Sequence, residues 1–384
     1  MVKKIISFLL LTAIFLFLGD AAVTAKSKLI RVAVLRNVDH CVIGIDGPYT
    51  MIDMVTGVKI DAGARMRPAL VCLKAGKINI GNKSYEPAKI IIQPQNEATL
   101  RIDDRHFRGS ITIIRDSDPS FTVINSIEIE QYIRGVLYHE VSDKWPLEAI
   151  EAQAVATRTY ALYAIEKSVT HDYDVTNDIY SQVYGGKTSE RYITNIAVKQ
   201  TRGEVLTYKG KIFPAFFHAN SGGITEDAYE LWQIDLPPLR GGVESPFSVN
   251  SPHYNWSKNF RLKDIQDKLN TKGLKLGLIK DIQVIERNKS GRVRKLQITT
   301  RDGKTEIMDG KVFREDIGPN VLRSNKYDVV MKGWYVDFVG HGWGHGVGLD
   351  QWGAYNMARL RYSYKQILSF YYPGSELVRF QDID

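Results

Sequence analysis

One glutamate, Glu140, has surroundings that suit a general acid. It lies in a polar turn between two apolar segments, and apolar side chains flank it: Val136, Leu137, Val141 and Trp145. Apolar surroundings disfavour the charged form of a carboxyl and raise its pKa toward the operating pH, as a proton donor requires. The structural alternatives for this glutamate are a cap at a helix entry and one half of an ion pair.

A second catalytic carboxyl is not evident near Glu140. Hydrolysis of a glycosidic bond usually needs two carboxylates about 5 to 10 Å apart. Asp143 and Glu148 fit better as charges favoured by the dipole at a helix N-terminus, and Asp350 is less securely placed. One carboxyl suffices if it first protonates the glycosidic oxygen and then takes a proton from a hydroxyl of the cleaved sugar. That reaction, lytic transglycosylation, closes a 1,6-anhydro ring without consuming water.

A glycine-rich block at 340–348 is the second place with chemical potential. Five of its nine residues are glycine, so its backbone can approach a ligand closely. Donors and flat apolar faces that suit sugars lie in it or just after it: His341, Trp343, His345, Gln351 and Trp352. The spacing of His341 and His345 also matches a helical zinc pair, although the glycines argue against a helix. A purely structural turn is the other alternative to the sugar-binding wall that we predict here.

A long helix over 146–166 must position Glu140. Proline is tolerated at the first helical position because that N–H has no partner within the helix, so Pro146 can begin it. Apolar residues recur at helical spacing and predict its buried face: Leu147, Ile150, Ala154, Ala161 and Leu162. Polar Gln153, Thr157 and Arg158 interrupt a run of alanines, which indicates the wall of a cleft.

The remaining pattern predicts an α+β fold. Residues 28–105 contain short runs rich in Val, Ile, Thr and Tyr between turn residues, which are typical of strands. From 107 onward a predicted hairpin, helices and strands mix without regular alternation. We expect a signal peptide at 1–25, a small mainly-β N-terminal domain at 26–105, and a mixed catalytic domain at 106–384 with a central helix and antiparallel strands.

Two long motifs resemble the SpoIID/LytB family, named for stage II sporulation protein D and an amidase enhancer. The first is GVLYHEVSDKWPLEAIEAQAVATRTYALY at 135–163, and the second is GHGWGHGVGLDQWGAYNMA at 340–358. QVYGG at 182–186, FHANSGGITE at 217–226 and SGRVRKLQI at 290–298 lie between them in the family's order. The likeness covers roughly residues 107 to 378.

The resemblance implies lytic transglycosylation of peptidoglycan with Glu140 as the catalytic residue, and it adds substrate contacts. His218, with Ser221 and Gly222 in the following turn, resembles a cleft element whose N–H groups hold an anion or a carbonyl. Gln182 and Tyr184 match the family beside a Gly-Gly turn, and Arg158 can pair with a substrate carboxylate.

Two departures from the family's pattern affect the expected site. Where family members have two cysteines suited to zinc, this chain has Thr176 and Ser181, so we expect no metal or other cofactor there and a loop braced by hydrogen bonds. His139 precedes Glu140 where the family has a smaller residue. A neighbouring imidazole can hydrogen-bond Glu140 or, when charged, lower its pKa.

The N-terminus predicts export. A short positive segment, an apolar run from Ile5 to Gly19 and the small-residue site at 23–25 are typical of a secretory signal peptide, and an uncleaved signal anchor is the alternative. The basic net charge of +8 favours polyanionic partners of the cell wall, while export disfavours nucleic acid. Cys41 and Cys72 either form one disulfide or stay buried thiols.

The sequence therefore predicts an exported protein of the cell wall, the periplasm or the outer face of the membrane. We expect it to act as a lytic transglycosylase on the MurNAc–GlcNAc bond of peptidoglycan glycan strands. The resemblance further implies a preference for glycan stripped of peptides and cooperation with a cell-wall amidase. The rival hypothesis is a non-catalytic wall-binding activator of an N-acetylmuramoyl-L-alanine amidase, and a metal hydrolase built on His341 and His345 is a third.

Overall fold

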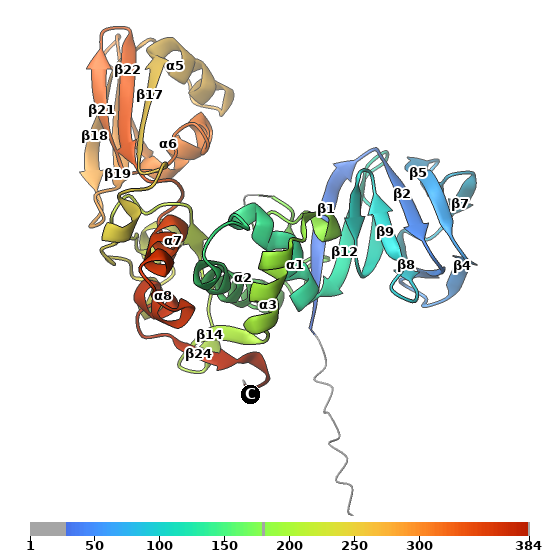
Figure 1. The fold of residues 1–384 in the computed structure, drawn as a ribbon. Coiled ribbons are helices and arrows are strands. Elements are labelled where there is room, and N and C mark those ends of the chain that lie inside the picture. Colours follow the sequence, from blue (N-terminus) through green and yellow to red (C-terminus); the bar gives the residue numbers. More distant parts are fainter. Residues whose placement is uncertain (1–27, 179–180, 383–384) are drawn as a thin grey trace, which may run out of the picture.

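The computed structural model describes residues 28–178 and 181–382. The predicted signal peptide at 1–25 lies outside this range. Figure 1 shows three parts in a row: a mainly-β part at one end, a helical part in the middle and a smaller lobe of sheets and helices at the other end. Among the described residues, no helix has both the length and the hydropathy that crossing a bilayer requires.

Two sheets form the N-terminal part. The first has the strand order β13-β1-β12-β11-β8-β3-β4, and the second has the order β10-β9-β2-β5-β6-β7. Their bounds are β1 Leu29–Val38, β2 His40–Asp46, β3 Tyr49–Asp53, β4 Lys59–Gly63, β5 Met66–Lys74, β6 Lys77–Ile80, β7 Lys83–Tyr85, β8 Lys89–Pro94, β9 Thr99–Ile102, β10 Arg105–Phe107, β11 Ser110–Arg115, β12 Phe121–Glu128 and β13 Val175–Thr176. The predicted hairpin is confirmed as β11 and β12, and it completes the first sheet from beyond residue 105.

The two sheets bury the apolar residues of their alternating strands in one core. The central helix α2 also contributes to that core, through Ile150, Ala154, Ala161 and Leu162. The cysteines form no disulfide: both thiols are free, Cys41 is buried and Cys72 is partly exposed. They lie on the adjacent strands β2 and β5, but each faces a different residue, since Cys41 pairs with Val71 and Cys72 with His40.

The central helix α2 separates this core from a second one. On its other face the small residues Ala149, Ala152, Val155 and Ala156 pack against the C-terminal helices. The neighbouring elements are α1 Ile129–Glu140, α2 Leu147–Lys167, α3 Tyr192–Gln200, β14 Glu204–Tyr208, β15 Lys211–Ile212, β16 Phe217–His218, α4 Ala228–Trp232, β23 Leu349–Asp350, α7 Gln351–Arg359, α8 Tyr364–Tyr371 and β24 Glu376–Arg379. Small side chains let helices approach on two sides, which explains the alanine-rich sequence of α2.

The third part is a lobe with its own core. Two three-stranded antiparallel sheets, β17-β22-β21 and β18-β19-β20, carry two helices. Their bounds are β17 Asn255–Arg261, α5 Leu262–Thr271, β18 Ile279–Arg287, β19 Val293–Thr300, β20 Thr305–Asp309, α6 Gly310–Ile317, β21 Tyr327–Lys332 and β22 Tyr335–His341. This lobe ends where the glycine-rich block begins.

The predicted α+β class, with a mainly-β N-terminal region, is confirmed. Two local expectations differ from the structure. Glu140 is the last residue of helix α1 rather than part of a turn between segments. The apolar run FPAFFHAN at 213–220 is typical of a buried strand, but only Phe217–His218 is a strand in the structure, because Pro214 has no N–H to give to a sheet.

Candidate active site

Glu140 lines a pocket of about 720 Å³ between the middle part and the C-terminal lobe. We call it the Glu140 pocket. Its walls come from the end of α1, from α2, α4 and α6, and from the chain around 216–219 and 343–345. The side chains that carry its polar and aromatic chemistry are His139, Glu140, Tyr160, Asp178, His218, Trp232, Lys311, Arg314, Glu315, Trp343, His345 and Gln351.

The end of helix α1 places the Glu140 carboxyl half-buried in the pocket. Burial raises its pKa to about 7, and hydrogen bonds from the Gln351 side chain and the Val183 backbone oppose that rise. The negative end of the α1 dipole acts in the same direction as burial. At neutral pH such a carboxyl is divided between its acid and its base form, so it can both give and take a proton.

Gln351 joins the glycine-rich block to Glu140. Its Nε2 lies 3.4 Å from Glu140 Oε2 and 3.3 Å from Gln153 Oε1. Gln351 stands at the start of α7, where Asp350 caps the helix by accepting from the Gly353 N–H. The two motifs that are far apart in sequence therefore meet at the carboxyl, as the sequence predicted for the wall beside Glu140.

Two neutral histidines form the back of the pocket. Burial above all, and then the neighbouring His345 and Arg292, hold the pKa of His218 well below its ordinary value. Burial and the Arg314 charge lower the pKa of His345 to about 3. His218 Nδ1 lies 3.1 Å from the Val347 carbonyl oxygen, so Nδ1 carries the proton and Nε2 is an acceptor. Among the described residues, that buried Nε2 has no hydrogen-bond partner.

Aromatic faces line the pocket beside these histidines. Trp232 stacks on Phe216 with ring centroids 4.4 Å apart and meets the His345 ring edge-on at 5.2 Å. Trp343 is half-buried and contacts His253 at 4.9 Å. Trp343 was a predicted site residue, whereas Trp232 was not, because it lies on the short helix α4 whose sequence has no periodic pattern.

The C-terminal lobe adds charged residues that the sequence did not reveal. Helix α6 brings Lys311, Arg314 and Glu315 to the pocket, and Asp178 reaches it from the loop before the QVYGG motif. Lys311 Nζ donates to the Leu231 carbonyl oxygen at 3.0 Å. Nothing in the sequence around α6 distinguishes its charges from those of an ordinary surface helix, so only the tertiary structure shows them.

Three of the predicted substrate contacts lie in the core instead. Arg158 is 1% exposed and its Nε and Nη2 each lie 2.9 Å from a Glu130 carboxylate oxygen. Gln182 accepts from the Tyr132 hydroxyl at 2.9 Å, and the Tyr184 hydroxyl donates to Asn125 Oδ1 at 2.8 Å. The structure thus corrects these expectations: all three side chains are satisfied by internal partners and none lines the pocket.

The turn at 220–223 also binds an internal partner. The Ser221 N–H donates to Asp350 Oδ2 at 2.9 Å, and the Gly222 N–H donates to Asn220 Oδ1 at 2.8 Å. Ser221 and Asp350 are both fully buried. We expected the N–H groups of this turn to bind an anion of the substrate. The Asp350 carboxylate takes that place at the Ser221 N–H, so the turn positions the segment after the glycine-rich block and does not contact a substrate.

His341 and Trp352 lie outside the pocket lining. His341 Nδ1 is 2.9 Å from Asn255 Oδ1. Trp352 packs with Trp145 and Tyr355, with ring centroids 5.1 and 5.3 Å away. These half-buried rings continue the aromatic surface that begins at Trp343, through His253, whose ring lies 5.7 Å from Trp352.

No metal cluster is evident where the resemblance would place one. Within residues 28–178 and 181–382, no three His, Cys, Asp or Glu side chains gather as a metal site would require. Thr176 and Ser181 are joined by hydrogen bonds of 3.0 and 3.1 Å, which brace the loop in the way the sequence predicted.

These features define an α+β protein with a half-buried carboxyl in the lining of an aromatic-rich pocket. Two family models match the chain: one described as Stage II sporulation protein over residues 117–208, and one described as Domain of unknown function (DUF8618) over residues 244–348. The first spans α1 to α3, including Glu140. The second covers the C-terminal lobe and the whole glycine-rich block.

Curated relatives agree with these matches. Stage II sporulation protein D of Bacillus subtilis is 31% identical over 289 residues, which is 70% of this chain and 78% of that protein. A protein of Brachyspira hyodysenteriae named as uncharacterised is 31% identical over 361 residues, 94% of this chain and 95% of that protein. The amidase enhancer of Bacillus subtilis is 28% identical over 357 residues, 80% of this chain and 49% of that protein. The chain belongs to the SpoIID/LytB family and has a cell-wall-related role.

Proposed function

We propose that this protein is an exported lytic transglycosylase that cleaves the MurNAc–GlcNAc bond of peptidoglycan glycan strands. The observation that carries the proposal is the Glu140 carboxyl, half-buried in the pocket with its pKa raised to about 7 by burial. A carboxyl with this pKa supplies both protonation states at neutral pH, as a single acid and base must. Export rests on the N-terminal sequence alone.

The reaction needs no second protein carboxyl. Protonated Glu140 gives its proton to the glycosidic oxygen, and the bond between that oxygen and the MurNAc C1 breaks with its electron pair going to the oxygen. The C6 hydroxyl of the same MurNAc then bonds to C1 and gives its proton to the Glu140 carboxylate. Glu140 returns to its acid form, and the products are a GlcNAc end and a 1,6-anhydro-MurNAc end.

The pocket supports sugar binding through its aromatic and neutral polar groups. Trp232 and Trp343 offer flat apolar faces beside the polar groups of the lining. The rings of Trp352 and Trp145 extend the aromatic surface beyond Trp343, which suits a strand longer than one disaccharide. Peptide-free glycan fits the proposal best, since the family resemblance implies it.

Two further carboxyls in the pocket define a competing chemistry. Asp178 lies 2.8 Å from the Arg36 guanidinium, and Glu315 is exposed on α6. If either one activated water, the products would have reducing ends and the protein would be an ordinary glycosidase. Replacement of each by its amide distinguishes the two mechanisms, because transglycosylation depends on Glu140 alone.

The amidase enhancer relative favours a second candidate function. A wall-binding activator would use the same pocket to hold glycan without cleaving it, and would raise the activity of a separate cell-wall amidase. Such a protein would tolerate loss of the Glu140 proton donor.

The deciding experiment is a digest of purified, peptide-free glycan, with the products weighed by mass spectrometry. We expect 1,6-anhydro ends from the wild-type chain and from Asp178→Asn and Glu315→Gln, and none from Glu140→Gln. Reducing ends would show a hydrolase, and the absence of products from the wild-type chain would favour the activator.

A further inference from the structure

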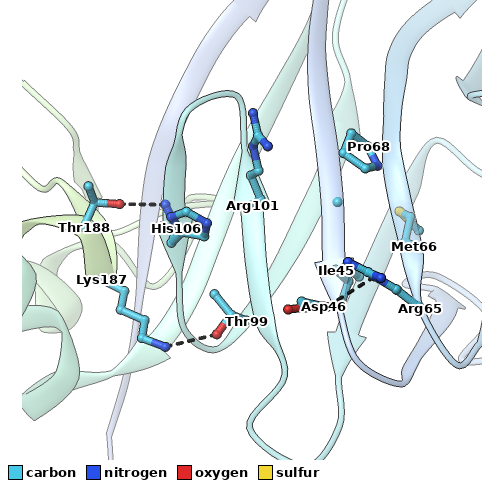
Figure 2. A pocket seen from close by; sticks show the side chains of 11 residues that line it. Ile45, Asp46, Arg65, Met66, Pro68, Thr99, Arg101, His106, Lys187 and Thr188 are labelled. Carbon is cyan, nitrogen blue, oxygen red and sulfur yellow. Dashed lines mark hydrogen bonds and ion pairs between the residues drawn. The ribbon is translucent and has the colours of Figure 1, made fainter.

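A second hollow, of about 560 Å³, lies between the N-terminal sheets and the middle part. We call it the N-terminal hollow. Its lining comes from β2, β5 with the residue before it, β9, β10 and the 3-10 turn at 186–189: Gly44, Ile45, Asp46, Arg65, Met66, Pro68, Thr99, Arg101, His106, Lys187 and Thr188. Figure 2 shows Lys187 and Thr188 on one side of it and Met66 and Pro68 on the other. None of these residues belongs to the Glu140 pocket.

The floor of the N-terminal hollow is formed where Gly44 has no side chain and where the pairing of β2 with β5 contains a bulge. Across the second sheet, His106 pairs with Arg101 and Arg101 pairs with Gly44, so the three occupy one row on one face. Between β2 and β5 the register shifts from Ile43 opposite Ala69 to Ile45 opposite Met66, so Arg67 and Pro68 together face Gly44. A bulge of this kind redirects the strand and its side chains. The row therefore has a gap at Gly44 between the Arg101 and Pro68 positions.

The middle part holds the opposite wall by direct contacts. Lys187 Nζ donates to Thr99 Oγ1 at 3.1 Å, and the His106 N–H donates to Thr188 Oγ1 at 2.8 Å (Figure 2). A Cβ on Gly186 would lie 2.5 Å from the His106 carbonyl oxygen, so the turn fits closely against β10. The wall is thus part of the fold and not a loose surface loop.

The charges around the hollow favour a ligand that carries mainly negative groups together with a positive group. Three cations, Arg65, Arg101 and Lys187, line the hollow together with a single carboxylate, Asp46, which lies 3.2 Å from Arg65; Arg101 Nη2 also lies 3.5 Å from the Asp104 carboxylate outside the lining. In the part of the chain that the structure describes, Lys187 has no ion-pair partner. Exposed Pro68 supplies the apolar surface of the floor beside Gly44, and the side chains of Ile45 and Met66 lie buried in the core beneath it. Cations bind carboxylates, Asp46 can hold an amine, and the floor accepts methyl groups.

We propose that the N-terminal hollow binds the stem peptide of peptidoglycan. A stem peptide is short, and it carries free carboxylates, a free amino group and alanine methyl groups, which match the three kinds of lining residue. A polymer of phosphodiesters matches less well, because it would meet Asp46 with repulsion and would leave the apolar floor unused. The choice of polymer rests on the proposed wall function; the site itself rests on the geometry of the hollow.

One hydrogen bond links the hollow to the Glu140 pocket. The 3-10 turn that carries Lys187 and Thr188 ends at Ser189, whose Oγ lies 2.6 Å from His139 Nε2, and His139 immediately precedes Glu140. A strand that still bears peptides can therefore be held beside the pocket in which a peptide-free strand is cut. This arrangement places the enzyme at the border between stripped and unstripped glycan.

The experiment is a calorimetric titration of the purified full chain with the synthetic tetrapeptide L-Ala–γ-D-Glu–meso-diaminopimelate–D-Ala. We expect saturable binding that weakens with salt, and a loss of about tenfold or more in affinity in the double variant Arg101→Gln/Lys187→Gln. The matched control, Lys258→Gln/Lys280→Gln, removes the same charge from exposed positions of the C-terminal lobe and should bind like the wild type.

A steric variant tests the site without changing its charge. A Cβ on Gly44 would make only ordinary contacts of 3.5 Å with Met66 and Pro68, so Gly44→Val fits the strand and fills the floor. It should weaken peptide binding as well. Cleavage of peptide-free glycan should stay at the wild-type rate in Gly44→Val and in Arg101→Gln/Lys187→Gln, which separates this site from the proposed reaction.

Three results would overturn the proposal: no binding of the tetrapeptide, equal binding by the wild type and the Arg101→Gln/Lys187→Gln variant, or tighter binding of poly(glycerol phosphate) that the same variant abolishes. If glycan cleavage is absent in every variant while peptide binding follows the expected pattern, the proposed function fails and the peptide site stands.

Discussion

The two ends of helix α1 carry glutamates that differ in whether a cation pairs with them. At the start, Glu130 is 6% exposed and accepts two hydrogen bonds of 2.9 Å from the Arg158 guanidinium. At the end, Glu140 enters a pocket where, among the described residues, no cation forms an ion pair with it. A buried carboxylate needs such a partner to stay charged. A matched cation therefore makes one glutamate structural, whereas burial without such a cation raises the pKa of the other to about 7.

The largest expected effect is the loss of glycan cleavage when Glu140, at the end of α1, is replaced. Glu140→Gln keeps the shape and the hydrogen bond to Gln351 but removes the proton donor, so glycan cleavage should fall about 10²- to 10⁴-fold. The matched control is Glu130→Gln, assayed at a temperature where it remains folded, which should keep most of its activity per folded molecule. Equal losses of activity in the two variants would contradict a catalytic role that is specific to Glu140.

Breaking the ion pair at the start of α1 should affect the free energy of unfolding more than the activity. Arg158→Met leaves the Glu130 carboxylate buried without its cation, and breaking a buried ion pair in this way costs about 3 to 5 kcal/mol. The double variant Arg158→Met/Glu130→Leu removes both charges and should recover much of that loss. Denaturant unfolding monitored by circular dichroism measures both, and a single variant as stable as the wild type would contradict the structural role.

Glu140 should lower the stability of the folded chain at alkaline pH. Its folded pKa is raised from 4.5 to about 7. A group of this kind contributes stability below its unfolded pKa, and that contribution is lost as pH rises through its folded pKa. Glu140→Gln should therefore be more stable than the wild type by up to about 3 kcal/mol at pH 8, and by less than about 1 kcal/mol at pH 5. A pH-independent difference would show that the carboxyl does not titrate as proposed.

The rate of glycan cleavage should carry the same pKa. Because the first step needs the acid form, kcat/KM should fall about tenfold for each pH unit above about 7. The Arg101→Gln/Lys187→Gln variant, which alters only the N-terminal hollow, should give the same profile on peptide-free glycan. A profile that stays flat to pH 9 would assign the proton donor to another group.

The smallest effect belongs to Gln351. Its hydrogen bond lowers the pKa of Glu140, so Gln351→Leu should move the alkaline limb of the rate profile to higher pH by less than about one unit. A shift to lower pH would contradict the assigned direction of the hydrogen bond's effect.

The sequence predicted the kinds of side chain in the Glu140 pocket better than it predicted the full set of residues that line it. The apolar neighbours of Glu140 indicated a carboxyl with a raised pKa. The glycine-rich block supplied Trp343 and His345, the segment just after it supplied Gln351, and all three reach the pocket. Periodicity placed helix α2 to within a residue, because its small and apolar positions face two cores.

Internal partners explain the failures. Arg158 and the Ser221 turn have the residue types of a substrate site, but Glu130 and Asp350 satisfy them, and both partners are distant in sequence. The converse holds for Trp232 and Lys311, which lie on short or distant helices and reach the pocket only through the packing of the C-terminal lobe. Residue type predicts what a side chain can bind, whereas only the tertiary structure shows what it does bind.

The most direct test of the central claim is the titration of the Glu140 carboxyl itself. In the intact chain labelled with ¹³C-glutamate at the side-chain carboxyl, the signal absent from Glu140→Gln identifies it in NMR spectra recorded from pH 4 to pH 9. We predict a midpoint at about 7 for this signal. A midpoint below about pH 5, the ordinary range of a glutamate, would contradict it.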